Sequence, residues 1–427
     1  MRYNVVPLIT LTVLSLFALF IALGTFTIAL TGIDAVLWFY FILSLRTVKK
    51  LELSAKIFPS RVFTDDEVTC EVSLTNKSKF TLSSVEIQDF SSDGYIVSGD
   101  RNTFGSIDPG KSLSLKYSLK YRVRGEHTFY RVKIKSESSL RLFSIERYFD
   151  TERKVLVFPK ILPIEKFKTI LIEPVDGRKT DFKILEDSSH IVGVHEYSDE
   201  PFQRIHWKIS AHTDQLMVKE YEYTGSSNVR IYIDYNLPRE IYARNVWASM
   251  RKDYEEYASM AASGIVKYLF ERGMPITLKV LGKEIIEITP QMVRDYIPYL
   301  DALAIAKGTD EPEDGLLLQN QLISDMYSMS KTTTVVIISM YLTDGIIPIL
   351  LTAKSRAARL IVFVMPYGFR MPYDKKYDTY AILPGEIKRL RDQSIVLIEN
   401  NVMIHVMMDN ESVDEVIKRY ERSLGTL

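Results

Sequence analysis

The sequence predicts three structural parts: an N-terminal membrane anchor of one or two transmembrane helices, an immunoglobulin-like β-sandwich, and a doubly wound α/β domain at the C-terminal end. Three observations support this division. Residues 3–33 carry no charged side chain. Apolar and polar residues alternate through much of 51–160, and after residue 228 continuous apolar runs alternate with helix-like stretches. We expect boundaries at 1–50, 51–160, 161–227 and 228–427.

The composition excludes several classes of protein. Of 427 residues, 54 are Lys or Arg and 54 are Asp or Glu, so the formal net charge is zero. This excludes a nucleic-acid-binding protein that depends on a positive field over the whole molecule. Hydrophobic residues make up 46% of the chain, which excludes an acidic disordered protein. Cys70 is the single cysteine, so internal disulfides and cysteine-rich zinc modules are excluded as well.

The apolar N-terminal stretch is long enough to cross a membrane. Residues 8–30 include 14 Leu, Ile, Val or Phe residues, which together favour insertion by roughly 4–8 kcal/mol. A second helix over residues 26–45 would contain Asp34, and a hairpin that turns between Gly24 and Asp34 lowers the cost of burying that acid. One helix and two helices both remain open. A cleavable signal peptide is the competing interpretation, but no clear cleavage site follows the apolar run.

The charges around this stretch predict its orientation. Arg46, Lys49 and Lys50 follow the apolar region, whereas Arg2 alone precedes it. Because positively charged flanks stay on the cytoplasmic side, we expect an integral protein of the cell membrane with residues 51–427 in the cytoplasm. The zero net charge of the chain is thus the sum of +3 over the first fifty residues and −3 over the rest.

The region 51–160 is typical of a series of strands. Apolar side chains alternate with polar ones in 51–57, 68–74 and 113–121, and turn residues separate these runs. Residues 105–112 match the phosphate-binding loop pattern G-x4-G-K-[ST], but that motif needs a helix directly after it. A strand-like alternation follows here instead. We therefore interpret residues 108–111 as a type II turn and expect no bound nucleotide.

A dense pattern of charged and aromatic residues marks the region 194–222. Its three stretches are Val-His-Glu-Tyr-Ser-Asp-Glu at 194–200, Arg-Ile-His-Trp-Lys-Ile-Ser-Ala-His at 204–212, and Leu-Met-Val-Lys-Glu-Tyr-Glu at 216–222. Two interpretations are open. Ion pairs and a packed indole hold an extended segment against the next domain, or the side chains form a docking surface for a partner. The residues concerned are Glu196, Tyr197, Asp199, Arg204, Trp207, Lys208, Ser210 and Lys219.

The region after residue 228 predicts a doubly wound, mainly parallel sheet. In sheets of this kind, ligands bind beyond the carboxyl ends of the strands. The expected strands are the apolar runs 229–233, 276–281, 333–340, 360–365, 395–398 and 403–407. The expected helices are 247–271, 291–306, 316–329, 348–356, 384–391 and a final helix from 413.

These features together resemble the membrane proteins of domain-of-unknown-function family fifty-eight. The pattern of that family, R-E-Y … G-D … R-x-I-x-W-K-x-S-A-R … L-x-V-K-x-x-E, is similar to residues 195–222 here. The resemblance extends to the membrane hairpin, to Arg124 and Gly125 late in the β region, and to a strand that ends at Pro159, so it covers nearly the whole chain. The positions that depart from the family pattern are His195, Asp199, Glu200 and His212.

The resemblance implies a C-terminal domain similar to the von Willebrand factor type A domain. Such domains hold a divalent cation through an Asp-x-Ser-x-Ser motif after the first strand and an Asp after the fourth. Here Asp234 matches the first position, but Asn236 and Pro238 replace the serines. Met340 stands where the later acid is expected, and Asp344 follows four residues on. We therefore expect a degenerate metal site and no cofactor; a divalent cation held by Asp234 and Asn236 is the alternative.

The resemblance also implies a partner, because relatives in this family often lie beside MoxR-type AAA+ ATPases. The sequence has no nucleophile elbow and no paired acid–base motif. The leading expectation is a membrane-anchored, non-enzymatic adaptor that works with a MoxR-type ATPase in assembly or maturation of other proteins. Two alternatives remain. One is an enzyme that uses His206, His212 and Asp234 in a cleft, and the other is an outward-facing, adhesin-like binding module.

Overall fold

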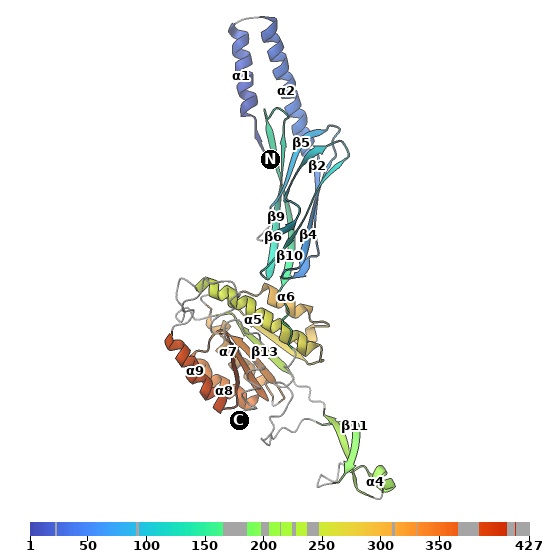
Figure 1. The fold of residues 1–427 in the computed structure, drawn as a ribbon, viewed down its shortest axis with the longest axis vertical. Helices are drawn as coiled ribbons and strands as arrows, with labels where there is room; N and C mark the ends of the chain where they lie inside the picture. The colour runs from blue at the N-terminus through green and yellow to red at the C-terminus, as the bar shows by residue number, and fades with distance from the viewer. Residues whose placement is uncertain are drawn as a thin grey trace. The chain divides into compact units, whose positions relative to one another are not determined.

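The computed structural model describes residues 1–21, 24–90, 94–164, 186–197, 205–213, 215–223, 228–236, 247–309, 312–330, 332–365, 384–407 and 415. The chain forms two compact units, Met1–Lys160 and Ile161–Leu427. The first unit is a pair of helices joined to a β-sandwich, and the second contains an α/β sheet and a two-stranded hairpin (Figure 1).

Two apolar helices begin the first unit: α1, Val6–Ile21, and α2, Thr25–Lys49. α2 is long and apolar enough to cross a membrane, and α1 is a shorter apolar helix beside it (Figure 1). Asp34 of α2 is buried between them, where its Oδ1 accepts a hydrogen bond from Thr12 Oγ1 at 3.1 Å. Trp38 Nε1 donates to the same Thr12 oxygen at 2.8 Å. The hairpin thus provides polar partners for the one acid in its apolar stretch.

A β-sandwich follows α2, as the sequence predicts. One sheet has the order β1-β10-β9-β5-β7, with β3 also paired to β10, and the other has the order β2-β4-β8-β6. Paired strands are antiparallel except β3 and β10. The strands are β1 Arg2–Asn4, β2 Leu51–Phe58, β3 Arg61–Phe63, β4 Glu67–Asn76, β5 Leu82–Phe90, β6 Tyr95–Ser98, β7 Asn102–Ile107, β8 Ser112–Lys120, β9 Gly125–Glu137 and β10 Ser144–Phe158.

Alternation along the strands builds the core of the sandwich. Val68, Cys70, Val72 and Leu74 of β4 are fully buried, and the residues between them are not. Burial raises the pKa of Cys70 to about 11, so its thiol stays protonated at neutral pH.

A buried ion pair on one sheet of the sandwich is hydrogen-bonded to the facing sheet. Arg153 of β10 contacts Asp89 of β5 through two hydrogen bonds, Nη2 to Oδ1 at 2.7 Å and Nη1 to Oδ2 at 3.1 Å. Tyr117 of β8, in the facing sheet, donates its hydroxyl to Asp89 Oδ2 at 2.8 Å. Both charged side chains are buried, so the bonds to the carboxylate offset the cost of removing it from water.

The residues that match the phosphate-binding pattern form a tight turn between β7 and β8, as predicted. Lys111 N donates to Asp108 O at 3.1 Å, and Gly110 has a φ of +73°, a left-handed conformation that favours glycine. β8 begins at Ser112, so a strand and not a helix follows the motif.

Three sets of contacts fix the helical hairpin to the sandwich. Arg147 Nη1, from β10, donates to the carbonyl oxygens of Val48, Lys49 and Leu51 at 2.8, 3.1 and 3.1 Å. β1 pairs antiparallel with the first residues of β10. The ring of Phe41 in α2 packs edge-on against Phe143, with centroids 5.1 Å apart. The N-terminal strand therefore lies at the same end of the hairpin as the sandwich (Figure 1).

The second unit is built on a six-stranded sheet with the order β15-β14-β13-β16-β17-β18, parallel throughout except for the edge strand β15. α5 contacts β13, β14 and β16. α7, α8 and α9 share a core with Tyr232, Val335 and Ile337 of the sheet. The strands are β13 Val229–Asp234, β14 Ile276–Leu281, β15 Ile285–Ile288, β16 Thr334–Ser339, β17 Arg359–Val364 and β18 Met403–Val406. The helices are α5 Trp247–Phe270, η3 Pro290–Met292, α6 Ile297–Ile305, η4 Asp314–Leu316, α7 Leu318–Asp325, η5 Met326–Ser328, η6 Asp344–Ile346, α8 Ile347–Arg356 and α9 Pro384–Glu399.

Two predictions for this sheet are wrong. Residues 395–398, predicted as a strand, are helical and belong to α9. Leu390 and Leu397, two helical turns apart, are buried, whereas Ile395 and Ile398 are exposed, so burial follows the period of a helix. The prediction also lacks β15, which is short and whose side chains are mostly half-buried. The predicted helix from 413 lies outside the described residues, except for Glu415.

The other part of the second unit is a small antiparallel hairpin. It consists of β11 Glu186–Glu196, α4 Trp207–Thr213 and β12 Met217–Tyr223. It contains the described residues of the charged and aromatic pattern.

We predict that Asp89→Asn lowers the free energy of unfolding of the sandwich by about 3–5 kcal/mol, because Arg153 then stays buried without its counter-charge. Urea denaturation of the intact chain in detergent micelles measures this. Asp150→Asn is the matched control, since Asp150 pairs with Arg131 on the exposed surface and its loss costs less than about 1 kcal/mol. Equal, small effects of the two variants would contradict the role given to the buried pair.

Candidate functional site

The carboxyl edge of the α/β sheet is the first candidate site. β13 and β16 are neighbours, and the chain continues from β13 to β14 on one side and from β16 to β17 on the other. Doubly wound sheets bind ligands at such a point of reversal. Asp234 ends β13 and lies in register with Ser339, which ends β16.

Asp234 is a buried carboxyl group with a raised pKa. Its side chain is only 9% exposed, and burial raises its pKa to about 7. The backbone N–H of Asn236, 3.0 Å from Asp234 Oδ1, opposes this shift but does not cancel it. The group therefore changes its charge near neutral pH, where a cation or a basic partner group would favour the ionised form.

The side chain of Asn236, the second predicted metal ligand, forms hydrogen bonds to several loops. Its Nδ2 donates to the carbonyl oxygens of Gly282 at 3.1 Å and Leu316 at 3.3 Å. Its Oδ1 accepts the backbone N–H of Thr309 at 3.2 Å. The amide thus links the end of β13 to the segment after β14 and to both ends of the segment between α6 and α7.

Gly308 and two side chains of α5 also lie at the carboxyl edge of the sheet. A Cβ on Gly308 would lie 2.3 Å from Tyr235 O, and the N–H of Gly308 donates to the buried Glu255 at 2.9 Å. Tyr254 donates its hydroxyl to Asp234 O at 2.6 Å. Sequence reasoning missed Tyr254 and Glu255 because they lie within a helix that alternates charged and aromatic residues. Gly282 and Gly308, at which other backbone segments approach closely, are the sequence features that could have pointed to this edge.

Asp344, the acid that follows β16, contacts residues of α9 and not Asp234. Asp344 lies in η6, where Arg389 Nε donates to its Oδ1 at 2.9 Å and Gln393 of α9 donates to the same oxygen. Within the described part of the chain, no group of three or more His, Cys, Asp or Glu side chains is placed to hold a metal ion. Asp234 and Asn236 are thus in contact with each other, whereas the side chain of Asp344 packs against α9.

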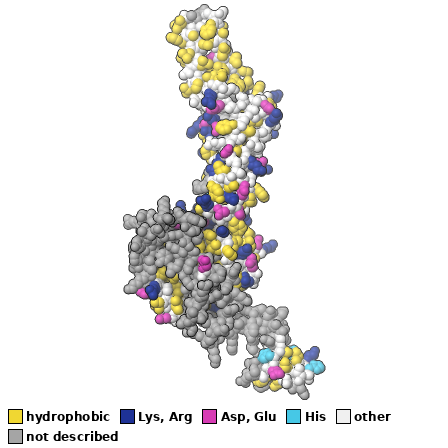
Figure 2. Space-filling model, in the orientation of Figure 1, with side chains coloured by type: hydrophobic (Ala, Val, Ile, Leu, Met, Phe, Trp, Pro, Cys, Tyr) yellow, Lys and Arg dark blue, Asp and Glu magenta, His cyan; other side chains and the backbone are white. Residues whose placement is uncertain are grey.

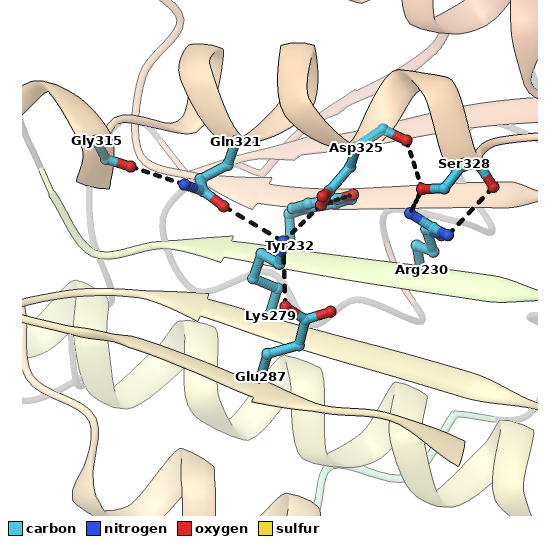
Figure 3. Close-up of polar contacts among 8 residues, drawn as sticks. All are labelled: Arg230, Tyr232, Lys279, Glu287, Gly315, Gln321, Asp325 and Ser328. Atoms are coloured by element: carbon cyan, nitrogen blue, oxygen red, sulfur yellow. Dashed lines mark hydrogen bonds and ion pairs between the residues drawn. The ribbon is translucent and has the colours of Figure 1, made fainter. Parts of the chain in front are cut away.

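A charged cluster centred on the buried Lys279 lies on the sheet face that α7 covers (Figure 3). Lys279 Nζ is 2.7 Å from Asp325 Oδ2 and 3.3 Å from Glu287 Oε2. Tyr232 donates its hydroxyl to the same Asp325 oxygen at 2.8 Å, and burial together with Asp325 raises the pKa of this tyrosine. Because Tyr232, Lys279 and Glu287 are in register across three strands, the cluster fixes α7 to the sheet.

A hollow of about 380 Å³ opens at the amino edge of the sheet, next to this cluster. Asn228, Arg230, Thr277 and Glu287 line it together with residues near the end of β15. Arg230 Nη1 also donates to Ser328 Oγ at 2.9 Å (Figure 3). Asp234 lies at the other end of β13, so the hollow and the point of strand reversal are separate features.

The β11–α4–β12 hairpin is held together by Ser210. Its hydroxyl oxygen accepts the backbone N–H of Met217 at 2.8 Å and lies 3.1 Å from His206 O, to which it donates. Ile205 and Val218 are buried and form a bridge. Ser210 is therefore a structural residue that fixes α4 on β12.

Other residues of the pattern lie on the surface of the hairpin. Trp207 begins α4 and is 64% exposed, which contradicts a packed indole, and Lys208 beside it is exposed. Glu196 at the end of β11 is exposed, whereas Tyr197 and Lys219 are half-buried. Asp199 and Arg204 lie outside the described residues. Tryptophan is enriched among the residues that contribute most to binding at protein interfaces.

The two histidines of the predicted cleft have separate environments. His206 precedes α4, and its Nδ1 accepts the N–H of Ile209 at 3.3 Å. His212 lies exposed in the last turn of the same helix. They therefore sit at opposite ends of α4.

Comparison with known proteins gives distant similarities. No family model matches the chain. The uncharacterized protein YeaD of Bacillus subtilis (strain 168) is 25% identical over 252 residues, which cover 57% of this chain and 59% of YeaD. This chain thus spans about three fifths of the length of that relative.

Two solved structures are similar to about a quarter of the chain. The cupredoxin domain of amoB from Nitrosocaldus yellowstonii is 11% identical with a TM-score of 0.20, over 25% of this chain and 86% of that one. The CARDB domain of PF1109 from Pyrococcus furiosus is 14% identical with a TM-score of 0.18, over 25% and 93%. At these TM-scores neither similarity supports an argument about this protein.

We predict that Asp234→Asn removes a pH-dependent loss of stability. The folded state binds the Asp234 proton up to a pKa of about 7, whereas the unfolded chain releases it near 3.8. The free energy of unfolding therefore falls as the pH rises from 4 to 7, by about 4 kcal/mol for this group at the upper end. The melting temperature of the intact chain in micelles, measured at pH 4 to 8, tests this.

The melting temperature of Asp234→Asn is expected to exceed that of wild type at pH 8 and to equal it at pH 4. The matched control is Asp392→Asn, at an exposed position, which should melt as wild type does at both pH values. An unchanged pH profile in Asp234→Asn would contradict the burial argument. If Mg²⁺ raises the melting temperature of wild type by several degrees but not that of Asp234→Asn, the expectation of a degenerate metal site is wrong.

Proposed function

We propose that this chain is a membrane-anchored, non-enzymatic interaction protein whose hairpin and α/β domain dock a protein partner in the cytoplasm. The exposure of Trp207 on a helix fixed by Ser210 is the observation that carries the docking role. A large aromatic side chain held in the open on a rigid element loses little conformational entropy when a partner buries it.

The anchoring role rests on the N-terminal helices. α2 has the length and composition of a membrane-spanning helix, and hydrophobic side chains greatly outnumber charged ones on the visible surface of the pair (Figure 2). Arg46 and Lys49 in the last turn of α2, followed by Lys50, support a cytoplasmic location for the parts that follow.

The identity of the partner rests on the sequence resemblance alone. We propose a MoxR-type AAA+ ATPase, for which this protein serves as adaptor in assembly or maturation of other proteins. The α/β domain is proposed to be of the von Willebrand factor type A kind, which the strand order and the position of Asp234 support. The sandwich is proposed to be immunoglobulin-like, a spacer between the membrane and the docking domain.

We predict that Trp207→Ala lowers partner recovery at least tenfold. The intact chain is cross-linked in native membranes and purified, and the captured proteins are identified by mass spectrometry. Wild type should recover an AAA+ ATPase, because removing a central aromatic anchor costs about 2 kcal/mol or more of binding energy. Phe104→Ala, an equally exposed aromatic in the sandwich, should recover as much ATPase as wild type.

Failure to capture an ATPase with wild type would contradict the proposed partner. Equal recovery with Trp207→Ala and wild type would contradict the proposed surface while leaving the partner in place.

A further inference from the structure

The end of the sandwich that adjoins the helical hairpin has its own surface chemistry. β2 begins there directly after α2, and three loops meet at the same end: 77–81 between β4 and β5, 108–111 between β7 and β8, and 138–143 between β9 and β10. Because β1 pairs with the first residues of β10, this end is held next to the hairpin (Figure 1).

The loop 77–81 is rigid and presents an exposed phenylalanine. Asn76 Nδ2 donates to Phe80 O at 2.8 Å and to Ile107 O at 2.9 Å, and the buried Ser78 receives the N–H of Phe80 at 3.2 Å. The side chain of Phe80 is nevertheless 50% exposed, and Lys79 beside it is exposed.

The loop 138–143 repeats this arrangement. The hydroxyl of the buried Ser138 accepts the N–H groups of Leu142 and Phe143 at 2.9 and 3.3 Å, and Arg141 N donates to Ser138 O at 2.8 Å. Leu140 at the tip is 72% exposed, and Arg141 adopts a φ of +55°. Two braced loops at one end therefore each pair an exposed apolar side chain with an exposed cation.

Positive charge is concentrated around these tips. Acidic side chains here are already paired, Asp108 with Lys111 at 2.8 Å and Glu52 with Lys77 at 3.9 Å. Six exposed cations have no ion pair within the described residues: Arg2, Arg46, Lys49, Lys50, Lys79 and Arg141. Figure 2 shows Lys and Arg side chains, with Asp and Glu side chains beside them, where the hydrophobic helices meet the sandwich.

Aromatic residues mark the same level of the molecule. Tyr3 is exposed beside Phe41, and Tyr40 of α2 reaches Ser83 at the start of β5, with the hydroxyl oxygens 3.1 Å apart. Tyrosine and tryptophan side chains are enriched at the boundary between lipid tails and headgroups. If α2 spans the bilayer, the loops 77–81 and 138–143 therefore lie at the depth of the lipid headgroups.

We propose that this end of the sandwich binds anionic phospholipids. Phe80 and Leu140 insert among the upper parts of the acyl chains, and Lys79 and Arg141 contact lipid phosphates, with Lys49 and Lys50 at the helix end. The inference rests on the proposed membrane anchoring and adds to it a lipid-binding surface that holds the sandwich on the bilayer. Arg147 makes this geometry stiff, since it fixes the end of α2 to β10.

Fluorescence of the intact chain in lipid nanodiscs tests the proposal. In a Cys70→Ala background, Leu140→Cys carries an environment-sensitive dye, and Val123→Cys, exposed at the opposite end of the sandwich, is the matched control. The nanodiscs contain phosphatidylcholine with or without phosphatidylglycerol, and brominated lipids serve as quenchers. We expect the dye at position 140 to be blue-shifted and quenched, more strongly with phosphatidylglycerol, and the dye at 123 to be unaffected.

The charge contribution is tested separately. Lys79→Gln with Arg141→Gln should reduce the phosphatidylglycerol-dependent part of the signal at position 140 at least threefold, because each cation near an anionic surface adds to the attraction. Lys56→Gln with Lys116→Gln, on the exposed face of β2 and β8, should leave it unchanged.

Two failures are distinguishable. If alkaline carbonate extracts the chain from membranes, the proposed anchoring is wrong. If the chain resists carbonate but the dye at 140 behaves as the dye at 123, or phosphatidylglycerol makes no difference, the lipid-binding surface alone is overturned.

Discussion

The contact between Arg147 and the end of α2 is the constraint on which the first unit depends. A helix leaves its last carbonyl groups without intrahelical partners, and a cation is favoured there by the helix dipole. Arg147 supplies hydrogen bonds to three carbonyls at this point, and its guanidinium also lies over the ring of Phe149, 4.1 Å from its centroid. The sandwich therefore continues from the hairpin without a flexible linker, and β1 returns the N-terminus to the same end.

Both units use an acid shared by a cation and a tyrosine to join two layers, and this acid is fully buried in the first unit and half-buried in the second. Asp89 does this between the two sheets of the sandwich, and Asp325 does it between α7 and the α/β sheet. Burying such charges costs desolvation energy that only a fully bonded arrangement offsets. Any strand or helix register that separates the acid from its cation and its tyrosine is therefore destabilised. Asp234 differs because burial without a cation leaves its pKa raised.

Much of the fold follows from periodicity, and much of the site does not. The alternation in β4 and the β-branched run of β16 were sufficient to predict the strands, and the alternation after Lys111 was sufficient to reject the phosphate loop. The run 395–398 misled because β-branched residues also occur in helices, where tertiary packing decides. Arg147 and Lys279 could not be predicted, since their partners lie far away in the chain. The exposure of Trp207 also depends on packing that no local pattern specifies.

The proposed anchor is a hairpin that enters and leaves the bilayer on one side. Single cysteines at Arg2→Cys and Val123→Cys, in sealed inside-out membrane vesicles and in intact cells, measure this with a membrane-impermeant maleimide. The buried, protonated Cys70 gives little background. We predict that both positions react in inside-out vesicles and that neither reacts in intact cells. Reaction of the two positions from opposite sides would contradict the pairing of β1 with β10 in the membrane-bound protein and the anchor built on it.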